Sequence, residues 1–304
     1  MKNNNLKGTV ILGLAALIWG LAFVAQSGAA ELVPSFTFNA VRSAIGSGAL
    51  YVFWLLTAKK QKRFFPETPT ERKHYYLCAA TCGVCLAVSI NLQQFGISAY
   101  PKGVASEARA GFITALYVIL VPIFSIFLKK RVGMPVLFGV LIAVSGVYLL
   151  CFSNGVVGIY IGDLLILISA VSFALHIINV DRFVSATGGI KLSIMQFAVA
   201  AGISAVLAFV FELNTIKLSN LIAAAPQILY LGIMSSGIAY TLQTIGQKYA
   251  EPTVASITMS LESVFAALGG WLISGNTLSY RELVGCALVF VAILVAQIPR
   301  KIRN

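Results

Sequence analysis

The sequence predicts an all-α polytopic membrane protein with about ten transmembrane helices, arranged as two five-helix halves of inverted topology. Three observations lead to this fold class: an apolar composition, long apolar stretches that recur along the chain, and a similarity between the two halves. Of the 304 residues, 59% are hydrophobic and 11% are charged, whereas soluble domains have roughly 45–50% apolar and about 25% charged residues. A water-soluble fold could not bury so much apolar surface, so we expect the lipid bilayer to surround this chain.

Ten apolar stretches make up most of the chain. Each has about 20 residues, which is long enough for an α-helix to cross a hydrocarbon core of roughly 30 Å. The first stretch follows basic residues, as a signal peptide does, but its apolar part is longer than that of a signal peptide and it has a counterpart in the second half. We therefore retain it. The expected spans are residues 8–27, 36–57, 76–99, 103–128, 133–151, 159–180, 191–211, 226–247, 252–274 and 280–298.

Polar residues, proline or glycine separate these spans. In the first half the breaks contain Pro34, a polar loop of about 18 residues after the second span, Pro101 and the basic run 129–131. The second half is divided in the same way, and the halves join near Asn154. Five cysteines all fall within apolar stretches, so we expect them to be packing residues and predict neither disulfides nor a metal site.

Basic residues are distributed unevenly between the two sides of the predicted bundle. A net charge of +12 would suggest a nucleic-acid partner in a soluble protein, but here Lys and Arg lie in short loops between apolar spans, and we expect no such partner. With the N-terminus in the cytoplasm, 17 of the 22 basic residues fall on the inner side and 3 on the outer side. The positive-inside rule therefore predicts that both termini are cytoplasmic.

The two halves of the chain resemble each other. At an offset of 154 residues Gly8 matches Gly162, and at an offset of 150 residues Gln93 matches Gln243 and the glycines three residues further on match as well. Each half has an odd number of spans, so the second copy enters the membrane upside down relative to the first. We predict one repeat over residues 1–154 and another over 155–304, with a solute site between them near the midplane.

Several segments resemble the EamA-type branch of the drug/metabolite transporter superfamily. They are Ala16 to Gly20, Phe112 to Tyr117 running into Val121-Pro122, and Leu261 to Trp271. Their order, spacing and duplication carry the resemblance, which covers residues 8 to 298. The resemblance implies ten helices in a 5+5 inverted repeat in the plasma membrane, and a protein that exports metabolites, amino acids or toxic compounds.

Glu262 is the deepest acidic residue of the predicted spans. It lies ten residues beyond Pro252, which corresponds to about 15 Å along a helix, near the middle of the hydrocarbon core. Ionisable groups at this depth are costly, and each is a candidate functional residue. Glu262 is predicted either to bind solute and couple its movement to protons, or to tie its helix to a neighbour through a hydrogen bond.

Arg42 and Arg109 are the basic residues inside predicted spans. Either guanidinium can bind a carboxylate or phosphate through two parallel hydrogen bonds. Both lie within about two turns of the outer surface, so the alternative is that they extend to the interface or pair with Glu31 or Glu107.

Uncharged polar and aromatic residues supply further candidates. His176 is predicted to be a neutral, hydrogen-bonded imidazole or a proton relay. Polar residues at repeat-related positions of the third and eighth spans either coordinate an amino-acid-like or heterocyclic solute or bridge helices. Two aromatic residues either line the solute site or pack against other helices. These candidates are Asn91, Gln93 and Gln94 in the third span, Tyr240 and Gln243 in the eighth, and the aromatic residues Trp19 and Tyr117.

The predicted function is therefore secondary transport of a small-molecule solute by alternating access, with no cofactor and no metal. The alternative is a membrane-embedded enzyme or a receptor. Asp163 and Asp181 are the only aspartates and lie 18 residues apart, and the His-Glu-x-x-His, Gly-x-Ser-x-Gly and nucleotide-binding loop patterns do not occur, all of which argues against an enzyme. The solute, the direction, the coupling, and the choice between monomer and homodimer stay open.

Overall fold

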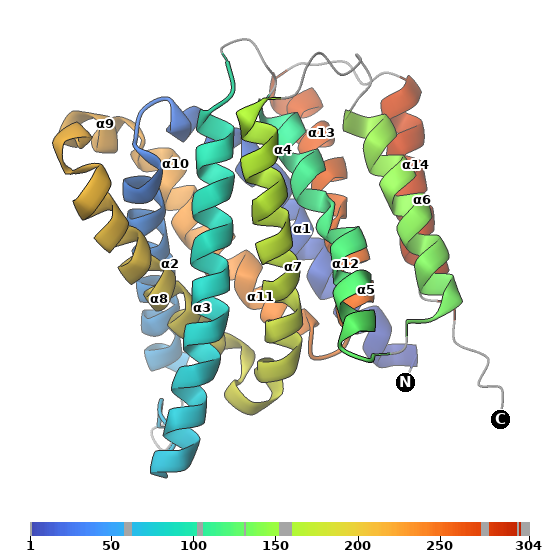
Figure 1. The fold of residues 1–304 in the computed structure, drawn as a ribbon, viewed down its shortest axis with the longest axis horizontal. Coiled ribbons are helices and arrows are strands. Elements are labelled where there is room, and N and C mark those ends of the chain that lie inside the picture. Colours follow the sequence, from blue (N-terminus) through green and yellow to red (C-terminus); the bar gives the residue numbers. More distant parts are fainter. Residues whose placement is uncertain are drawn as a thin grey trace.

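A computed structural model describes residues 2–57, 63–101, 106–130, 132–151, 160–274, 280–296 and 298. These residues fold into helices, with no strand among them. The helices stand side by side as a bundle (Figure 1).

The first half contributes six helical segments. The third begins with Thr68 as its N-cap, whose hydroxyl accepts from the backbone N–H of Glu71, and has Pro69 in its first turn, both of which favour a helix start. The fourth and fifth meet at Leu116 and together occupy one predicted span. The segments are α1 (Lys2–Ala30), α2 (Ser35–Thr57), α3 (Pro69–Ser98), α4 (Ser106–Ala115), α5 (Tyr117–Phe127) and α6 (Met134–Cys151).

The second half is more interrupted. Gly188 joins the first two of its helices in a left-handed conformation, with φ of 81°, which glycine adopts without strain. Further on, a π-helical segment lies between two short α-helices. The segments are α7 (Ile161–Thr187), α8 (Gly189–Phe211), η1 (Leu213–Thr215), α9 (Leu218–Ala223), α10 (Ala225–Tyr230), the π-helical η2 (Leu231–Ala239), α11 (Tyr240–Gly246), α12 (Pro252–Met259), α13 (Leu261–Ser274) and α14 (Tyr280–Ala296).

The structure confirms the all-helical fold over the described residues and contains helices suited to cross a membrane, whereas the count of ten spans stays a prediction. The predicted spans 133–151 and 280–298 correspond to shorter apolar helices, and the span 252–274 is divided between α12 and α13. The described helices that are long and apolar enough to cross a bilayer number seven: Leu6–Ala30, Ser35–Thr57, Pro69–Ser98, Arg109–Phe127, Ile161–Thr187, Gly189–Phe211 and Ala225–Gly246.

The helices of the two halves pack against each other throughout the bundle. α3 lies against α7 and α8, α2 against α8, α1 against α13, and α6 against α14. Small residues permit close crossings, as is common between membrane helices. Where α3 crosses α7, a Cβ added to Gly162 would lie 2.6 Å from the carbonyl oxygen of Gly96. Any side chain at this position would push the two backbones apart.

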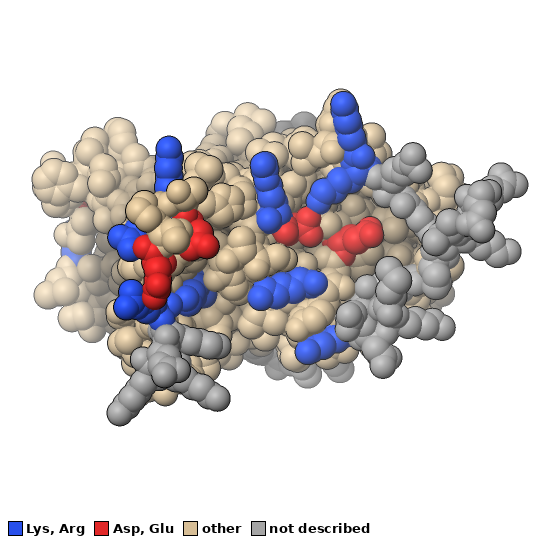
Figure 2. Space-filling view, turned by 90° about the horizontal axis from the view of Figure 1, so that it is seen from below, with Lys and Arg blue, Asp and Glu red and all other residues tan. Residues whose placement is uncertain are grey.

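Basic residues are exposed at one end of the bundle. α1 begins and α14 ends at the same end, which we call the Lys7 end (Figure 1). The opposite end, where α7 begins, is the Asp163 end. Figure 2 looks onto the Lys7 end, where several Lys and Arg side chains are spread over the surface. Exposed basic residues from the helix ends and loops located there include Lys7, Arg72, Lys130, Arg182 and Lys248.

Candidate functional site

A cavity lies between the two halves of the chain. Its volume is about 40 Å³, and since one water needs roughly 10–15 Å³ on this scale, there is room for a few water molecules. A solute of several heavy atoms therefore needs the surrounding helices to move. The described lining residues are Trp19, Ala22, Phe23 and Gln26 of α1, Arg42 of α2, Gln93 of α3, Thr114 of α4, Tyr117 of α5, Phe173 and Ile177 of α7, Ser235 of η2, Tyr240 and Gln243 of α11, Met259 of α12 and Glu262 of α13.

Glu262 and Tyr117 meet across this cavity. The Tyr117 hydroxyl donates to Glu262 Oε1 at 2.9 Å, and the Glu262 side chain is buried. Each residue follows a break in its span: Tyr117 is the first residue of α5, and Glu262 lies in the first turn of α13. The N-terminus of a helix favours an acidic group, and in transporter folds discontinuous helices of this kind frame solute sites. The carboxyl group of Glu262 thus lies at the cavity, with one of its two oxygens hydrogen-bonded to Tyr117.

Arg42 is buried beside the same cavity, and no acidic side chain of the described residues pairs with it. Its Nε donates to Asn39 Oδ1 at 2.7 Å, and the carbon of the guanidinium lies 5.4 Å from the centre of the Phe38 ring. The ion pairs formed by the described residues do not include Arg42. The expected pairing with Glu31 is therefore absent.

Other polar atoms around the cavity are only partly satisfied. Gln93 donates from Nε2 to the Thr114 hydroxyl at 3.0 Å. Among the described residues, Gln26 Oε1, Gln243 Oε1 and the Trp19 indole nitrogen have no hydrogen-bond partner. Buried polar atoms nearly always have a partner, which is protein, water or ligand. These three atoms are therefore available to a polar solute or to water.

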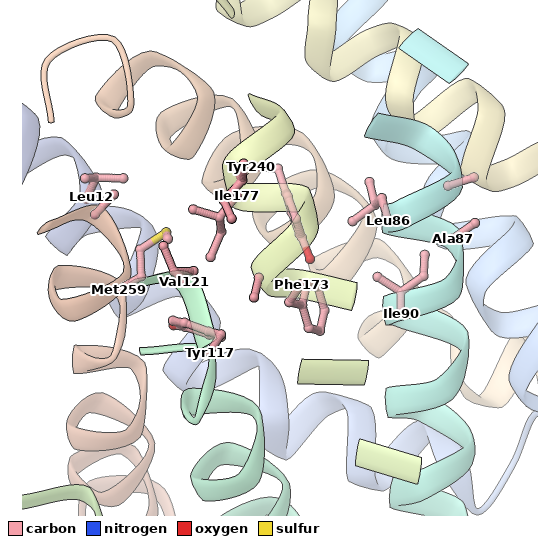
Figure 3. Packing of buried hydrophobic residues seen from close by; sticks show 14 of the residues in the cluster. Leu12, Leu86, Ala87, Ile90, Tyr117, Val121, Phe173, Ile177, Tyr240 and Met259 are labelled. Atoms are coloured by element: carbon pink, nitrogen blue, oxygen red, sulfur yellow. The ribbon is translucent and has the colours of Figure 1, made fainter. Parts of the chain in front are cut away.

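Aromatic side chains form part of the wall. Trp19 meets Tyr240 edge to face, with ring centres 4.8 Å apart, and Tyr240 meets Phe197 at 5.0 Å. Figure 3 shows Tyr117, Phe173, Tyr240 and Met259 projecting from different helices within one apolar cluster. The predicted aromatic candidates Trp19 and Tyr117 thus both border the cavity.

The structure does not bring every predicted candidate to the cavity. Fully buried His176 lies behind Tyr240, with ring centres 6.0 Å apart, and its Nε2 is 2.9 Å from Gln196 Oε1. Asn91 bridges helices by donating to the Ser204 hydroxyl at 2.8 Å. Gln94 donates to the backbone oxygen of Gln26 at 3.2 Å. Asn91 and Gln94 therefore bridge helices in this structure, and His176 is hydrogen-bonded within the protein.

Arg109 lies away from the cavity, at the Asp163 end. Its Nη2 is 2.6 Å from Asp163 Oδ2, so its acidic partner is Asp163 and not Glu107 or Glu31 as expected. The sequence spacing suggested partners near Arg109 in the chain, whereas the packing of α4 against α7 supplies one from the other half.

Sequence reasoning missed several lining residues. Gln26 and Thr114 are polar residues at membrane depth, and counting every amide and hydroxyl within the spans would have included them. Ser235 gave no signal, because a serine in an apolar helix is ordinary and the π-helical geometry that presents it is not visible in composition. Asn39, which holds Arg42, could have been found from its spacing of three residues on one helix.

Comparisons with known proteins give one consistent result. The family described as "EamA-like transporter family" matches twice, over residues 6–152 and 160–297. An uncharacterized transporter of Archaeoglobus fulgidus is 27% identical over 297 residues, which cover 94% of this chain and 84% of the relative. The uncharacterized transporter YdfC of Bacillus subtilis is 25% identical over 179 residues, covering 57% of this chain and 58% of YdfC. A crystal structure with 20% identity superposes with a TM-score of 0.76 over 95% of this chain and 97% of the other, which shows the same fold.

Proposed function

The chain belongs to the EamA-like transporter family, within the drug/metabolite transporter superfamily, and on this premise we propose that it is a secondary transporter that exports small metabolites, amino acids or drug-like solutes. Family and relatives support membrane transport, rather than enzyme catalysis, as its activity. The proposal of a solute site rests on one observation: both halves of the chain line a single cavity that holds a buried acid and a buried base. In membrane proteins, such groups mark solute and ion pathways.

Alternating access by two inverted five-helix halves is the mechanism that we propose. The two separate family matches support a division near residue 155, and the mixed lining of the cavity suits a site between moving halves. We place the protein in the plasma membrane with both termini in the cytoplasm. The exposed basic residues at the Lys7 end support this orientation.

Glu262 is the group that we propose to couple solute movement to protons. The Tyr117 hydroxyl holds Oε1, whereas no described residue donates to Oε2, and Glu262 is one of the residues that line the cavity. An acid in this position can carry a proton in one step of the cycle and contact a basic group of the solute in another. The buried His176 is a poorer candidate because Tyr240 separates it from the cavity.

Transport measurements in proteoliposomes test this proposal. A panel of amino acids, small carboxylic acids and amines is assayed with and without an imposed pH gradient. Glu262→Gln keeps the shape and the hydrogen bond with Tyr117 but removes the titrating group. We expect it to lose gradient-driven transport while retaining exchange of solute for solute.

The control is His176→Gln, which removes another buried titratable group outside the cavity. We expect this variant to keep gradient-driven transport. A wild-type rate in Glu262→Gln would rule out the coupling role. Failure of the wild-type protein to move any solute of the panel would count against transport itself.

A further inference from the structure

Arg42 is a buried cation whose charge no described residue neutralises. Its side chain is 3% exposed in a helix that is long and apolar enough to cross the bilayer. Charged residues at this depth almost always pair with an opposite charge or face a water-filled cavity. The described residues place no carboxylate oxygen within 4.0 Å of Arg42. A neutralising group is therefore expected from outside the protein.

A chain of hydrogen bonds fixes the direction of the guanidinium. Ser204 accepts from Asn91 at 2.8 Å, Asn91 accepts from Asn39 at 3.0 Å, and Asn39 accepts from Arg42 Nε at 2.7 Å. A second donor bond from Asn39 reaches the backbone oxygen of Ile90 at 3.0 Å. The network uses Nε, and no described residue accepts a hydrogen bond from the two Nη groups, which leaves them for other partners. Such support from neighbouring residues is what positions a binding group precisely.

The free edge of Arg42 suits a carboxylate. Two Nη groups in one plane match the two oxygens of a carboxylate and form two parallel hydrogen bonds. Arg42 borders the cavity together with Gln243 and Ser235. Gln243 Oε1 has no partner among the described residues, so its amide can turn to present the donating nitrogen to the same anion.

Glu262 lies on a different wall of the cavity. α2, which carries Arg42, packs against η2; η2 packs against α1; and α1 packs against α13, which carries Glu262. The two charged groups border one cavity without forming an ion pair. A solute that reaches both groups would present an anion at one end and a basic group at the other.

We propose that Arg42 is an anion-binding subsite of the cavity, and that the transported solute carries a carboxylate that docks on its Nη edge. The basic group of such a solute then faces Glu262. This inference rests on the proposed transport function for its physiological meaning, but anion binding at Arg42 can be measured without transport.

Fluorescence of Trp19 gives a direct readout, because Trp19 borders the cavity and the chain has only three tryptophans. With Trp54→Phe and Trp271→Phe, the remaining signal comes from Trp19. The probes are the twenty amino acids and chloride, which is added as sodium chloride and serves as a simple anion. For the amino acid that binds best, its amide, its deaminated acid and its decarboxylated amine are tested as well. We expect saturable signals from the amino acid and the deaminated acid, and much weaker binding of the amide.

Variants at Arg42 assign the signal to this residue. In Arg42→Gln we expect the affinity for carboxylate probes to fall by at least about tenfold, while the affinity for the decarboxylated amine stays within about twofold. Arg42→Lys keeps the charge but not the paired donors, so its loss should be intermediate. Thermal unfolding of each variant shows whether it is folded, and Arg42→Lys carries the test if Arg42→Gln is not.

The outcomes separate the two proposals. Carboxylate binding that depends on Arg42, without flux in proteoliposomes, would support the subsite and contradict transport. Flux of solutes that lack a carboxylate, unchanged in Arg42→Gln, would support transport and overturn the subsite. A signal from chloride alone, or no saturable signal from any carboxylate, would also overturn the subsite.

Discussion

Two ion pairs join α7 to its neighbours, one to α4 and one to the turn that follows α5, and the surroundings of the two pairs differ. At the Asp163 end, Arg109 and Asp163 lie 2.6 Å apart and their side chains are 14% and 13% exposed. At the Lys7 end, Lys130 and Asp181 also lie 2.6 Å apart, but their side chains are 48% and 22% exposed. The two pairs therefore contribute unequally to stability although their distances are equal, since solvent weakens an exposed pair.

The surroundings of Asp163 increase the difference. Tyr100 donates its hydroxyl to Asp163 Oδ1 at 2.7 Å, the backbone N–H of Tyr160 donates to Oδ2 at 2.9 Å, and Arg109 stacks 4.9 Å from the Tyr160 ring centre. Burial raises the pKa of the Tyr100 hydroxyl, which keeps its proton in place for this bond. Asp181 has one such contact among the described residues, the one with Lys130. In an alternating-access cycle, opening the Asp163 end would break more interactions.

The largest effect on stability is expected when one of these two aspartates is replaced. Asp163→Asn leaves Arg109 without its charge partner in a mostly buried place, and we expect unfolding to become easier by about 3 kcal/mol. Asp181→Asn should cost less than about 1 kcal/mol. Thermal unfolding in detergent measures both. Equal changes in Tm would show that the two ends are held with similar strength.

A smaller effect is expected at two repeat-related helix crossings, one at each end of the bundle. Gly162 and its repeat counterpart Gly8 leave different amounts of room for a side chain. A Cβ added to Gly162 would lie 2.6 Å from the Gly96 carbonyl oxygen, whereas a Cβ added to Gly8 would lie 3.1 Å from Tyr249 Cβ. We expect Gly162→Ala to cost about 1–3 kcal/mol and Gly8→Ala clearly less. Gly202→Ala, with nothing within 4 Å, is the control. A cost for Gly8→Ala as large as that for Gly162→Ala would contradict a tighter Asp163 end.

The smallest effect on the protein is expected from single cysteine substitutions that show which end of the bundle lies on which side of the membrane. In a chain without native cysteines, Lys217→Cys reports on the Asp163 end and Lys248→Cys on the Lys7 end; both lysines are exposed. We expect an impermeant maleimide to label the first in intact cells and the second only after permeabilisation. Labelling of both from outside would refute the proposed orientation, while leaving the difference between the ends intact.

The positions of the helices followed from apolar length. The expected spans 36–57 and 191–211 agree within two residues with Ser35–Thr57 and Gly189–Phe211, because a long apolar run has few other uses in a bilayer. The breaks at Leu116 and Ser260 were not predicted. They depend on packing between helices, which leaves no periodic signal in the sequence.

Depth in the membrane identified several residues of the candidate site, but it did not predict which side chains point into the cavity. Phe173 and Ile177 border the cavity on α7, whereas His176, which a helix turns about 100° from its neighbour Ile177, meets Gln196. Gln93 and Gln94 are adjacent, so a helix points them about 100° apart, and only Gln93 borders the cavity. The repeat indicated which positions were related, but not which face of each helix is turned inward.

The π-helical segment η2 ends directly before Tyr240, and its winding therefore decides where Tyr240 and Gln243 point. One residue of an α-helix corresponds to a rotation of about 100° and a rise of about 1.5 Å. Losing a single residue between Leu231 and Ala239 would rotate both side chains relative to the cavity, while the length of the span hardly changes. Gain or loss of one residue is an ordinary event in the history of a gene. In this segment it is a route by which a chain of this architecture acquires a different cavity without replacing any residue that lines it.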